Sequence, residues 1–224
     1  MSEFIKFENV KKIYSDGRYA VKDVSFVIHE KEYVLFHGAP ESGMSALIRL
    51  FSGLDAPTDG KIFINDRALH EVSRDEAADF RNLNFGIVQE TPCFLEHINL
   101  LENVALPLTV RGVSAHKRIK AAKQQLKDLG ILYATRAYPK QITTYEAQIA
   151  SIARALVARP KILLLEDITA GFSERESRQI LDIIEDVRKH GECVIIHFSG
   201  TKSGLLSADR YFTLDHGMIG EDMS

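Results

Sequence analysis

The sequence predicts an α/β fold with a mixed, mainly parallel sheet core, an antiparallel β subdomain and an inserted α-helical subdomain. Three short segments, 33–37, 161–166 and 193–197, are almost continuously apolar, as strands covered on both faces are. Helical stretches follow the first two of these segments. Between about residues 92 and 158 the periodicity turns helical, in the stretches NLLENVALPLTV, SAHKRIKAAKQQLKDLG and TYEAQIASIARALVARP, which indicates the insertion.

The elements follow in order along the chain. The first 30 residues and residues 60–69 alternate between apolar and polar side chains around the turn signals SDG and PTDG, which is typical of antiparallel strands. The strand YVLFH precedes the helical stretch MSALIRLFSGL. After KILLLE, apolar side chains recur at helical spacing at Ile180, Ile183, Ile184 and Val187. We expect a single domain over 1–224, with the helical subdomain at about 92–158.

Composition bounds the function classes. The formal net charge is -3 and the pI about 6.2, so a nucleic-acid partner is not expected. No signal-peptide pattern or bilayer-length apolar run occurs, so we expect a soluble intracellular chain. Cys93 and Cys193 are far apart, which fits free thiols in a reducing compartment. The histidines show no metal-binding spacing, so a nucleotide-bound magnesium ion is the one metal expected.

The segment GAPESGMS, residues 38–45, has the spacing of a phosphate-binding loop between a strand and a helix. Gly38, Gly43 and Ser45 stand at the two glycine positions and the hydroxyl position. In such loops backbone amides surround the phosphates, and a lysine before the hydroxyl residue adds positive charge. Met44 occupies the lysine position. The loop therefore keeps the spacing of the motif without its cation.

Other segments fit the same reading: Tyr14 upstream, VQETPCFLEHINLLENVALPL, YPKQITTYEAQIASIARALVARPKILLLED and His197. Together they resemble the ATP-binding subunits of ABC transporters, most closely the group serving lipoprotein release, macrolide export and cell division. The resemblance covers nearly the whole chain and implies the P-loop NTPase fold of ABC ATPases. It implies ATP and Mg²⁺ as cofactors, and as partners an integral membrane permease subunit and a second ATP-binding subunit in a homodimer or heterodimer. It also implies a peripheral position on the cytoplasmic face of the membrane.

The resemblance implies a set of nucleotide contacts: Tyr14, Gly38, Glu41, Ser42, Gly43, Met44, Ser45, Ala46, Gln89, Glu90 and Asp167. Ser45 and Asp167 are the implied, weak Mg²⁺ ligands. Glu41 stands where the family usually has another glycine, and Ala46 replaces a second hydroxyl. A carboxylate about 4 Å from a phosphate is repelled by about 4 kcal/mol at an effective dielectric near 20. We therefore expect weak ATP binding.

The implied catalytic positions are altered as well. Ile168 stands where the family has the glutamate that polarises water, and an isoleucine has no lone pair for that task. His197 matches the switch histidine. The glutamine that links nucleotide to the membrane partner is Gln89 or is replaced by Glu90, and the ungapped alignment favours Glu90. The signature segment reads Thr143, Thr144, Tyr145 and Glu146, so a ring replaces a glycine.

Taken singly, these residues also fit structural roles: turn glycines, a strand-end aspartate, a packed tyrosine or histidine. Taken together, they indicate a degenerate nucleotide site. The leading hypothesis is a cassette subunit of a transporter-like membrane complex that hydrolyses ATP poorly or not at all. The alternatives are an active ATPase that energises export or lipoprotein or peptide transport, with other residues replacing the lost groups, and a soluble regulatory or scaffold protein. Phe94, Leu95 and Leu101 are expected either to contact the permease or to form subdomain core.

Overall fold

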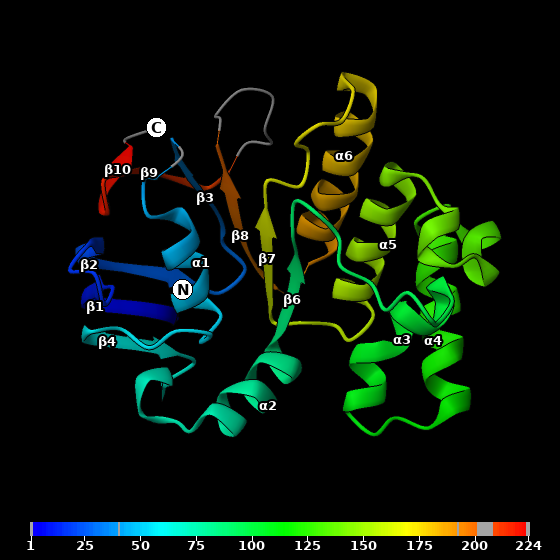
Figure 1. Cartoon of the computed structure of the whole chain (residues 1–224), viewed down its shortest axis with the longest axis horizontal. Helices are drawn as coiled ribbons and strands as arrows, with labels where there is room; N and C mark the ends of the chain where they lie inside the picture. Colours follow the sequence, from blue (N-terminus) through cyan, green and yellow to red (C-terminus); the bar gives the residue numbers. More distant parts are fainter. Residues whose placement is uncertain (1, 40, 192, 201–207, 223–224) are drawn as a thin grey trace. The chain divides into compact units, whose positions relative to one another are not determined.

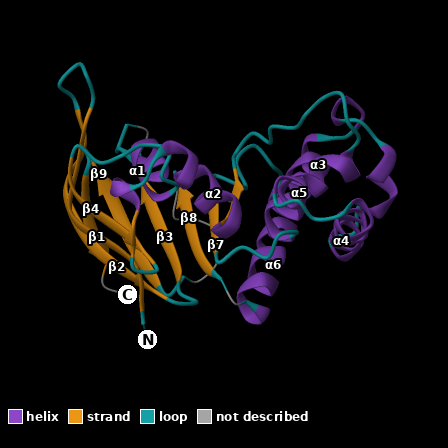
Figure 2. Cartoon of the chain, turned by 90° about the horizontal axis from the view of Figure 1, so that it is seen from below, coloured by secondary structure: helices purple, strands orange, loops and turns teal. Residues whose placement is uncertain are grey.

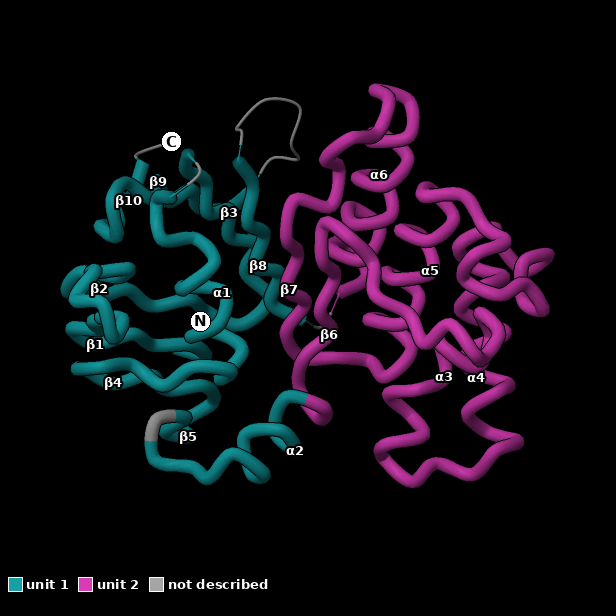
Figure 3. Tube along the Cα trace, in the orientation of Figure 1, with its two compact units in different colours: residues 1–81, 192–224 teal, residues 82–191 magenta. Residues whose placement is uncertain are grey.

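The computed structural model describes residues 2–39, 41–191, 193–200 and 208–222. The chain forms two compact units, which Figure 3 distinguishes by colour. Unit 1 comprises residues 1–81 and 192–224, and unit 2 comprises residues 82–191. The helix α2, Arg74–Asn84, runs across the boundary in the sequence.

Unit 1 contains the expected antiparallel sheet, with strand order β2-β1-β4-β5 (Figure 1). Its strands are β1 Glu3–Ile13, β2 Tyr19–His29, β4 Asp59–Ile64 and β5 Arg67–Ala68. Phe7 pairs with Phe26 on one side and with Ile62 on the other, and these three side chains are buried. The alternation read from the sequence is therefore confirmed, although residues 69–71 form the 3-10 helix η1, Leu69–Glu71.

The second group of strands in unit 1 is mixed. The strand β3, Tyr33–Gly38, lies parallel to both β8, Val194–Ser199, and β9, Arg210–Asp215. The last strand, β10, Met218–Asp222, pairs antiparallel with β9. Almost every residue of β3 and β8 is buried, as their continuous hydrophobicity predicted.

The helix α1, Met44–Phe51, is fixed by an aromatic cluster in unit 1. The Phe51 ring lies 4.6 Å from that of Phe7, 5.6 Å from that of Phe36 and 5.8 Å from that of Phe198, between ring centroids. Such ring pairs add about 0.5–1.5 kcal/mol beyond area burial. Strands from both groups thus hold the helix and fix the loop that precedes it.

Unit 2 combines a pair of parallel strands with the helices α3, α4, α5 and α6, which Figure 2 draws in purple. The strands are β6 Phe85–Val88 and β7 Ile162–Glu166; the helices are α3 Leu100–Val110, α4 Ala115–Asp128, α5 Thr144–Leu156 and α6 Glu174–His190, with the 3-10 helices η2 Leu132–Arg136 and η3 Pro139–Gln141. Strand β6 was not anticipated, because four residues with an internal glycine give little periodic signal.

Three α-helices of unit 2 begin with a capping box. The pairs are Asn99 with Glu102 for α3, Thr143 with Glu146 for α5, and Ser173 with Glu176 for α6. In each pair the first side chain accepts from a backbone N–H of the first turn, and the glutamate carboxylate accepts in return from the cap residue. The helix starts are therefore encoded locally.

Candidate nucleotide site and family

The phosphate-binding loop follows β3 and ends at the start of α1 in unit 1. Gly43 precedes α1 with φ 102°, a left-handed conformation that favours glycine. A Cβ on Gly43 would collide with the carbonyl oxygen of Ala20, and one on Gly38 would lie 2.6 Å from that of Leu214. Both glycines are therefore required by close backbone approach, beyond the needs of a simple turn.

The side chains of the loop, residues 38–45, include no Lys, Arg or His. Glu41 is exposed and holds φ 72°, a conformation that glycine adopts more readily. Met44 is half-buried, Ser45 is exposed in the first turn of α1, and Ala46 is buried. The loop thus keeps the backbone form of an anion cradle, while its one formal charge is a carboxylate.

Ser42 has an unusual position in this loop. Its side chain packs against Gly38, and its Oγ is buried with no hydrogen-bond partner in the described part of the chain. Its carbonyl accepts from the Gly217 N–H at 2.7 Å, and the Gly217 carbonyl accepts from the Lys22 N–H at 2.7 Å. The β9–β10 turn therefore braces the loop.

A second brace lies one residue before the loop and was missed from the sequence. His37 Nε2 lies 3.1 Å from an Asp222 carboxylate oxygen and 2.9 Å from the Thr213 hydroxyl oxygen. The Thr213 hydroxyl donates to the other Asp222 oxygen at 2.7 Å. These contacts join β3 to β9 and β10, whose residues are about 180 positions from His37 in the sequence. No local pattern could therefore have indicated them.

Two further residues of unit 1 that the resemblance implies as site residues, Tyr14 and His197, contact other side chains of the protein. Tyr14 is half-buried, and the Arg18 guanidinium lies 5.8 Å from the centre of its ring. His197 lies inside β8 and is fully buried, with Nδ1 2.9 Å from the Tyr33 hydroxyl oxygen and Nε2 without a partner in the described chain. Burial lowers the pKa of His197 to about 4, so the ring is neutral at pH 7. This placement favours the packing role for His197 over phosphate sensing.

In unit 2, the carboxyl ends of the parallel strands β6 and β7 bring acidic side chains together. Glu90 follows β6 and is exposed, and Glu166 ends β7 beside Asp167. Burial, with the negative charges of Asp167 and Glu90, raises the pKa of Glu166. Among the described residues, no group of three or more His, Cys, Asp or Glu side chains is placed so that it could hold a metal ion.

The next residue, Ile168, is fully buried. Its backbone carbonyl accepts from the Gln148 amide at 3.2 Å, and the same amide donates to the Gln89 carbonyl at 3.3 Å. Gln148 is itself fully buried in α5 and joins the ends of both strands. No local pattern indicated this link, because an isolated glutamine in a helix is usually exposed.

The signature segment forms the start of α5. Thr143 Oγ1 accepts from the Glu146 N–H, and the Glu146 carboxylate accepts from the Thr143 N–H at 2.7 Å and from the Tyr133 hydroxyl at 2.6 Å. The Tyr133 hydrogen bond, with that of the Thr143 N–H, lowers the pKa of Glu146. The helix N-terminus, which attracts anions, therefore has a carboxylate of its own.

Tyr145 stands on the same first turn of α5. It is half-buried and its ring meets that of Phe172 edge to face, with centroids 6.3 Å apart. Burial raises the pKa of its hydroxyl. An aromatic pair thus occupies the position where the resemblance implies a glycine.

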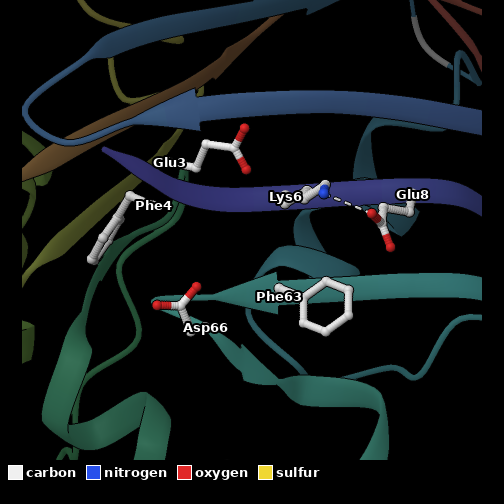
Figure 4. Close-up of a pocket in the computed structure, with 6 residues that line it drawn as sticks. All are labelled: Glu3, Phe4, Lys6, Glu8, Phe63 and Asp66. Carbon is white, nitrogen blue, oxygen red and sulfur yellow. Dashed lines mark ion pairs between the residues drawn. The ribbon is translucent and has the colours of Figure 1, made fainter. Parts of the chain in front are cut away.

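A shallow surface pocket in unit 1 is separate from these motifs. It is lined by Glu3, Phe4, Lys6, Glu8, Phe63 and Asp66, on β1, β4 and the turn after β4 (Figure 4). Lys6 and Glu8 form an ion pair of 2.7 Å within it. None of the predicted nucleotide contacts lines this pocket.

Comparisons with known proteins agree with the motifs. The profile of the ABC transporter family matches residues 21–170. A lipoprotein-releasing system ATP-binding protein LolD of Pseudoalteromonas translucida is 32% identical over 188 residues, 83% of this chain and 81% of the relative. A macrolide export ATP-binding/permease protein MacB of Pasteurella multocida is 29% identical over 97% of this chain, which spans 34% of that protein.

A solved structure supports the same assignment. The dimeric ATP-binding cassette MJ0796, in a post-hydrolysis state bound to ADP and phosphate, matches with a TM-score of 0.89 and 26% identity, over 97% of this chain and 98% of that one. In the described residues of the present chain, no helix is long and apolar enough to cross a membrane. The chain belongs to the ABC transporter family, as an ATP-binding cassette of the group that includes lipoprotein-releasing and macrolide-export proteins.

Proposed function

We propose that this chain is a cassette subunit of a membrane transporter complex that binds ATP weakly or not at all and hydrolyses it poorly. One observation carries the proposal: the phosphate-binding loop keeps its backbone form, while an exposed glutamate and a half-buried methionine, Glu41 and Met44, replace its usual glycine and lysine. A phosphate in this loop would meet backbone dipoles and a carboxylate without a compensating cation.

The hydrolytic position supports the same proposal. Ile168 is fully buried, so its side chain does not contact water, and a hydrocarbon side chain has no lone pair that could accept a proton. The first turn of α5 supplies a carboxylate and the Tyr145 ring where the resemblance implies glycines. Ser45 in unit 1 and Asp167 in unit 2, the two residues that the resemblance assigns to Mg²⁺, each carry a side-chain oxygen, the kind of ligand that this ion prefers.

An active ATPase is the second candidate, and one observation favours it. Glu166 has a raised pKa and lies near Asp167 and Glu90, and a carboxyl group tuned toward neutral pH is suited to general-base work. In this alternative Glu166 or Glu90 would take the role of the missing glutamate. Asp167 would still be needed to hold magnesium.

A steady-state ATPase assay of the full chain separates the two candidates. The first proposal expects phosphate release at the buffer rate, unchanged by Asp167→Asn and by Glu166→Gln. Release by the wild type that Asp167→Asn abolishes would establish the active ATPase instead. A titration with magnesium-ATP in the same preparation tells whether nucleotide is bound without turnover.

The proposal includes partners and a location. We place the chain, as one domain over 1–224, on the cytoplasmic face of the membrane beside a permease subunit and a second cassette, identical or different. Named relatives support this: one unites ATP-binding and permease functions, and another cassette is a dimer. A soluble scaffold is the remaining alternative.

The loop between β6 and α3 supplies a surface for the permease. Asn103, fully buried in α3, binds both backbone groups of Leu95, at 2.8 and 3.0 Å, and leaves the Leu95 side chain 45% exposed. Phe94 lies beneath the Arg154 guanidinium, 4.7 Å from its ring centre. Copurification of a membrane protein with the wild type, lost on Leu95→Asp, supports the proposal; copurification of none favours the scaffold.

A further inference from the structure

One helix of unit 2 differs in charge from the rest of the chain. Helix α4 carries five Lys or Arg side chains and a single Asp, a formal charge of +4. The whole chain has a charge of -3, so the residues outside α4 carry -7. The net charge of the whole chain is negative, so it gives no indication of this basic helix.

The cations of α4 form a row. Lys120, Lys123 and Lys127 are separated by steps of three and four residues, and such steps return to one face of a helix. At a rise of 1.5 Å per residue the row is about 10 Å long. All three side chains are exposed. The opposite side of the helix buries Ala122 and Leu126, so the row faces solvent.

The row is not neutralised by the protein. In the described part of the chain, no carboxylate forms an ion pair with Lys117, Lys120, Lys123 or Lys127. Elsewhere in unit 2 exposed lysines do find partners: Lys140 pairs with Glu96 at 2.7 Å and Lys189 with Glu185 at 3.7 Å. Lysines of like charge at this spacing, without an ion-pair partner among the described residues, repel one another, and an anionic surface would relieve this repulsion.

We propose that the lysine row of α4, namely Lys120, Lys123 and Lys127, contacts the anionic headgroups of a lipid membrane. Lysine is a compact, hydrated point charge without the planar fork that reads phosphate or bases in specific geometry, so it suits a diffuse layer of headgroups. The choice of lipid over nucleic acid rests on the proposed function, which places the chain at a membrane.

One feature of unit 2 favours the same partner. Val110, at the end of α3 in the hairpin that α3 and α4 form (Figure 1), is 71% exposed. An interfacial layer would cover this apolar side chain, while a nucleic-acid backbone would not.

Vesicle binding of the purified full chain tests the proposal. The probes are phosphatidylcholine vesicles with and without about 30% phosphatidylglycerol, at low and at physiological salt. We expect binding to the anionic vesicles alone, weakened by salt, since each lysine near such a surface contributes about fivefold to the partition coefficient. Lys120→Gln/Lys123→Gln/Lys127→Gln should lower the coefficient on the order of 100-fold.

A matched control carries the same charge change elsewhere. Lys22, Lys31 and Lys61 are exposed and, in the described chain, in no ion pair, so Lys22→Gln/Lys31→Gln/Lys61→Gln removes three comparable charges outside α4. Equal loss in both triple variants, or no binding by the wild type at low salt, overturns the proposal. Tighter binding of a single-stranded RNA than of anionic vesicles does so too.

The outcome is distinguishable from failure of the proposed function. Copurification with a permease depends on protein contacts, whereas vesicle binding by the isolated chain does not. A glutamine triple variant that retains the permease but loses the vesicles supports the lipid contact on its own. A wild type that retains the permease but ignores anionic vesicles refutes only the lipid contact.

Discussion

The two units place the motif residues in different surroundings. In unit 1 the loop before α1 has a demanding backbone, with Gly38 and Gly43 packed against neighbouring carbonyls, and Met44 stands at the lysine position. In unit 2 Ile168 belongs to the core, and Glu146 caps the N-terminus of α5. The glycines of the unit 1 loop therefore follow from close backbone packing, while the motif positions of unit 2 hold side chains that stabilise the fold.

The largest effect is expected in unit 2. Replacing Ile168 with glutamate places a carboxyl group at a fully buried position, and should lower the free energy of unfolding by about 4 kcal/mol without creating ATPase activity. Urea unfolding and phosphate release measure the two quantities. Ala170→Glu, at an exposed position of the same segment, is the control and should change stability little. A stable Ile168→Glu protein that hydrolyses ATP would show that the site lacks only its general base.

The backbone of the unit 1 loop is tested by Gly43→Ala. The added methyl group meets the Ala20 carbonyl and the residue must hold φ 102°, so unfolding should become easier by about 3 kcal/mol. Gly112→Ala is the matched control, since Gly112 has φ 71° but no atom within 4 Å of the added carbon, and should cost about 1 kcal/mol. Equal costs measured by urea unfolding would mean that close packing does not hold the loop.

The dependence of the free energy of unfolding on pH tests whether His197 is a core residue. Its pKa of about 4 in the fold lies below the ordinary value of 6.5, so the unfolded chain binds a proton that the folded chain does not. Stability from this group is therefore complete above pH 6.5 and falls as the pH drops to 4, by about 3 kcal/mol. Urea midpoints at pH 7, 6 and 5 measure the slope. His197→Gln should reduce it, and an unchanged slope would assign the acid sensitivity to other groups.

Restoring the charge of the unit 1 loop gives the smallest expected effect. Met44→Lys combined with Glu41→Gly adds a cation and removes an anion, and should tighten ATP binding about 30-fold, a free energy of about 2 kcal/mol. Calorimetric titration with magnesium-ATP measures it. The single variant Met44→Leu is the control, because it adds no lysine to the loop and should bind ATP as the wild type does. Tight binding by wild type and double variant alike would contradict the electrostatic account.

Much of the fold followed from local pattern. The apolar runs at 33–37, 161–166 and 193–197 predicted the strands observed at 33–38, 162–166 and 194–199. Alternation and turn residues predicted the antiparallel strands. The short strand at 85–88 was missed because four residues give too little periodicity. At the site, spacing alone identified the loop glycines, yet it could not show that Ile168 and His197 are fully buried.

The sequence by itself determined which chemical groups the site can use: a methionine and a glutamate in the loop, an isoleucine after Asp167, and no glycine pair at 144–145. Side-chain chemistry is a property of the residue, so these departures from the family pattern needed no coordinates. The tertiary structure decided which residues hold the remaining pieces, through the Gly217 turn, the His37–Asp222 contact and Gln148. These contacts join residues far apart in the chain, and only packing in three dimensions brings such partners within hydrogen-bond distance.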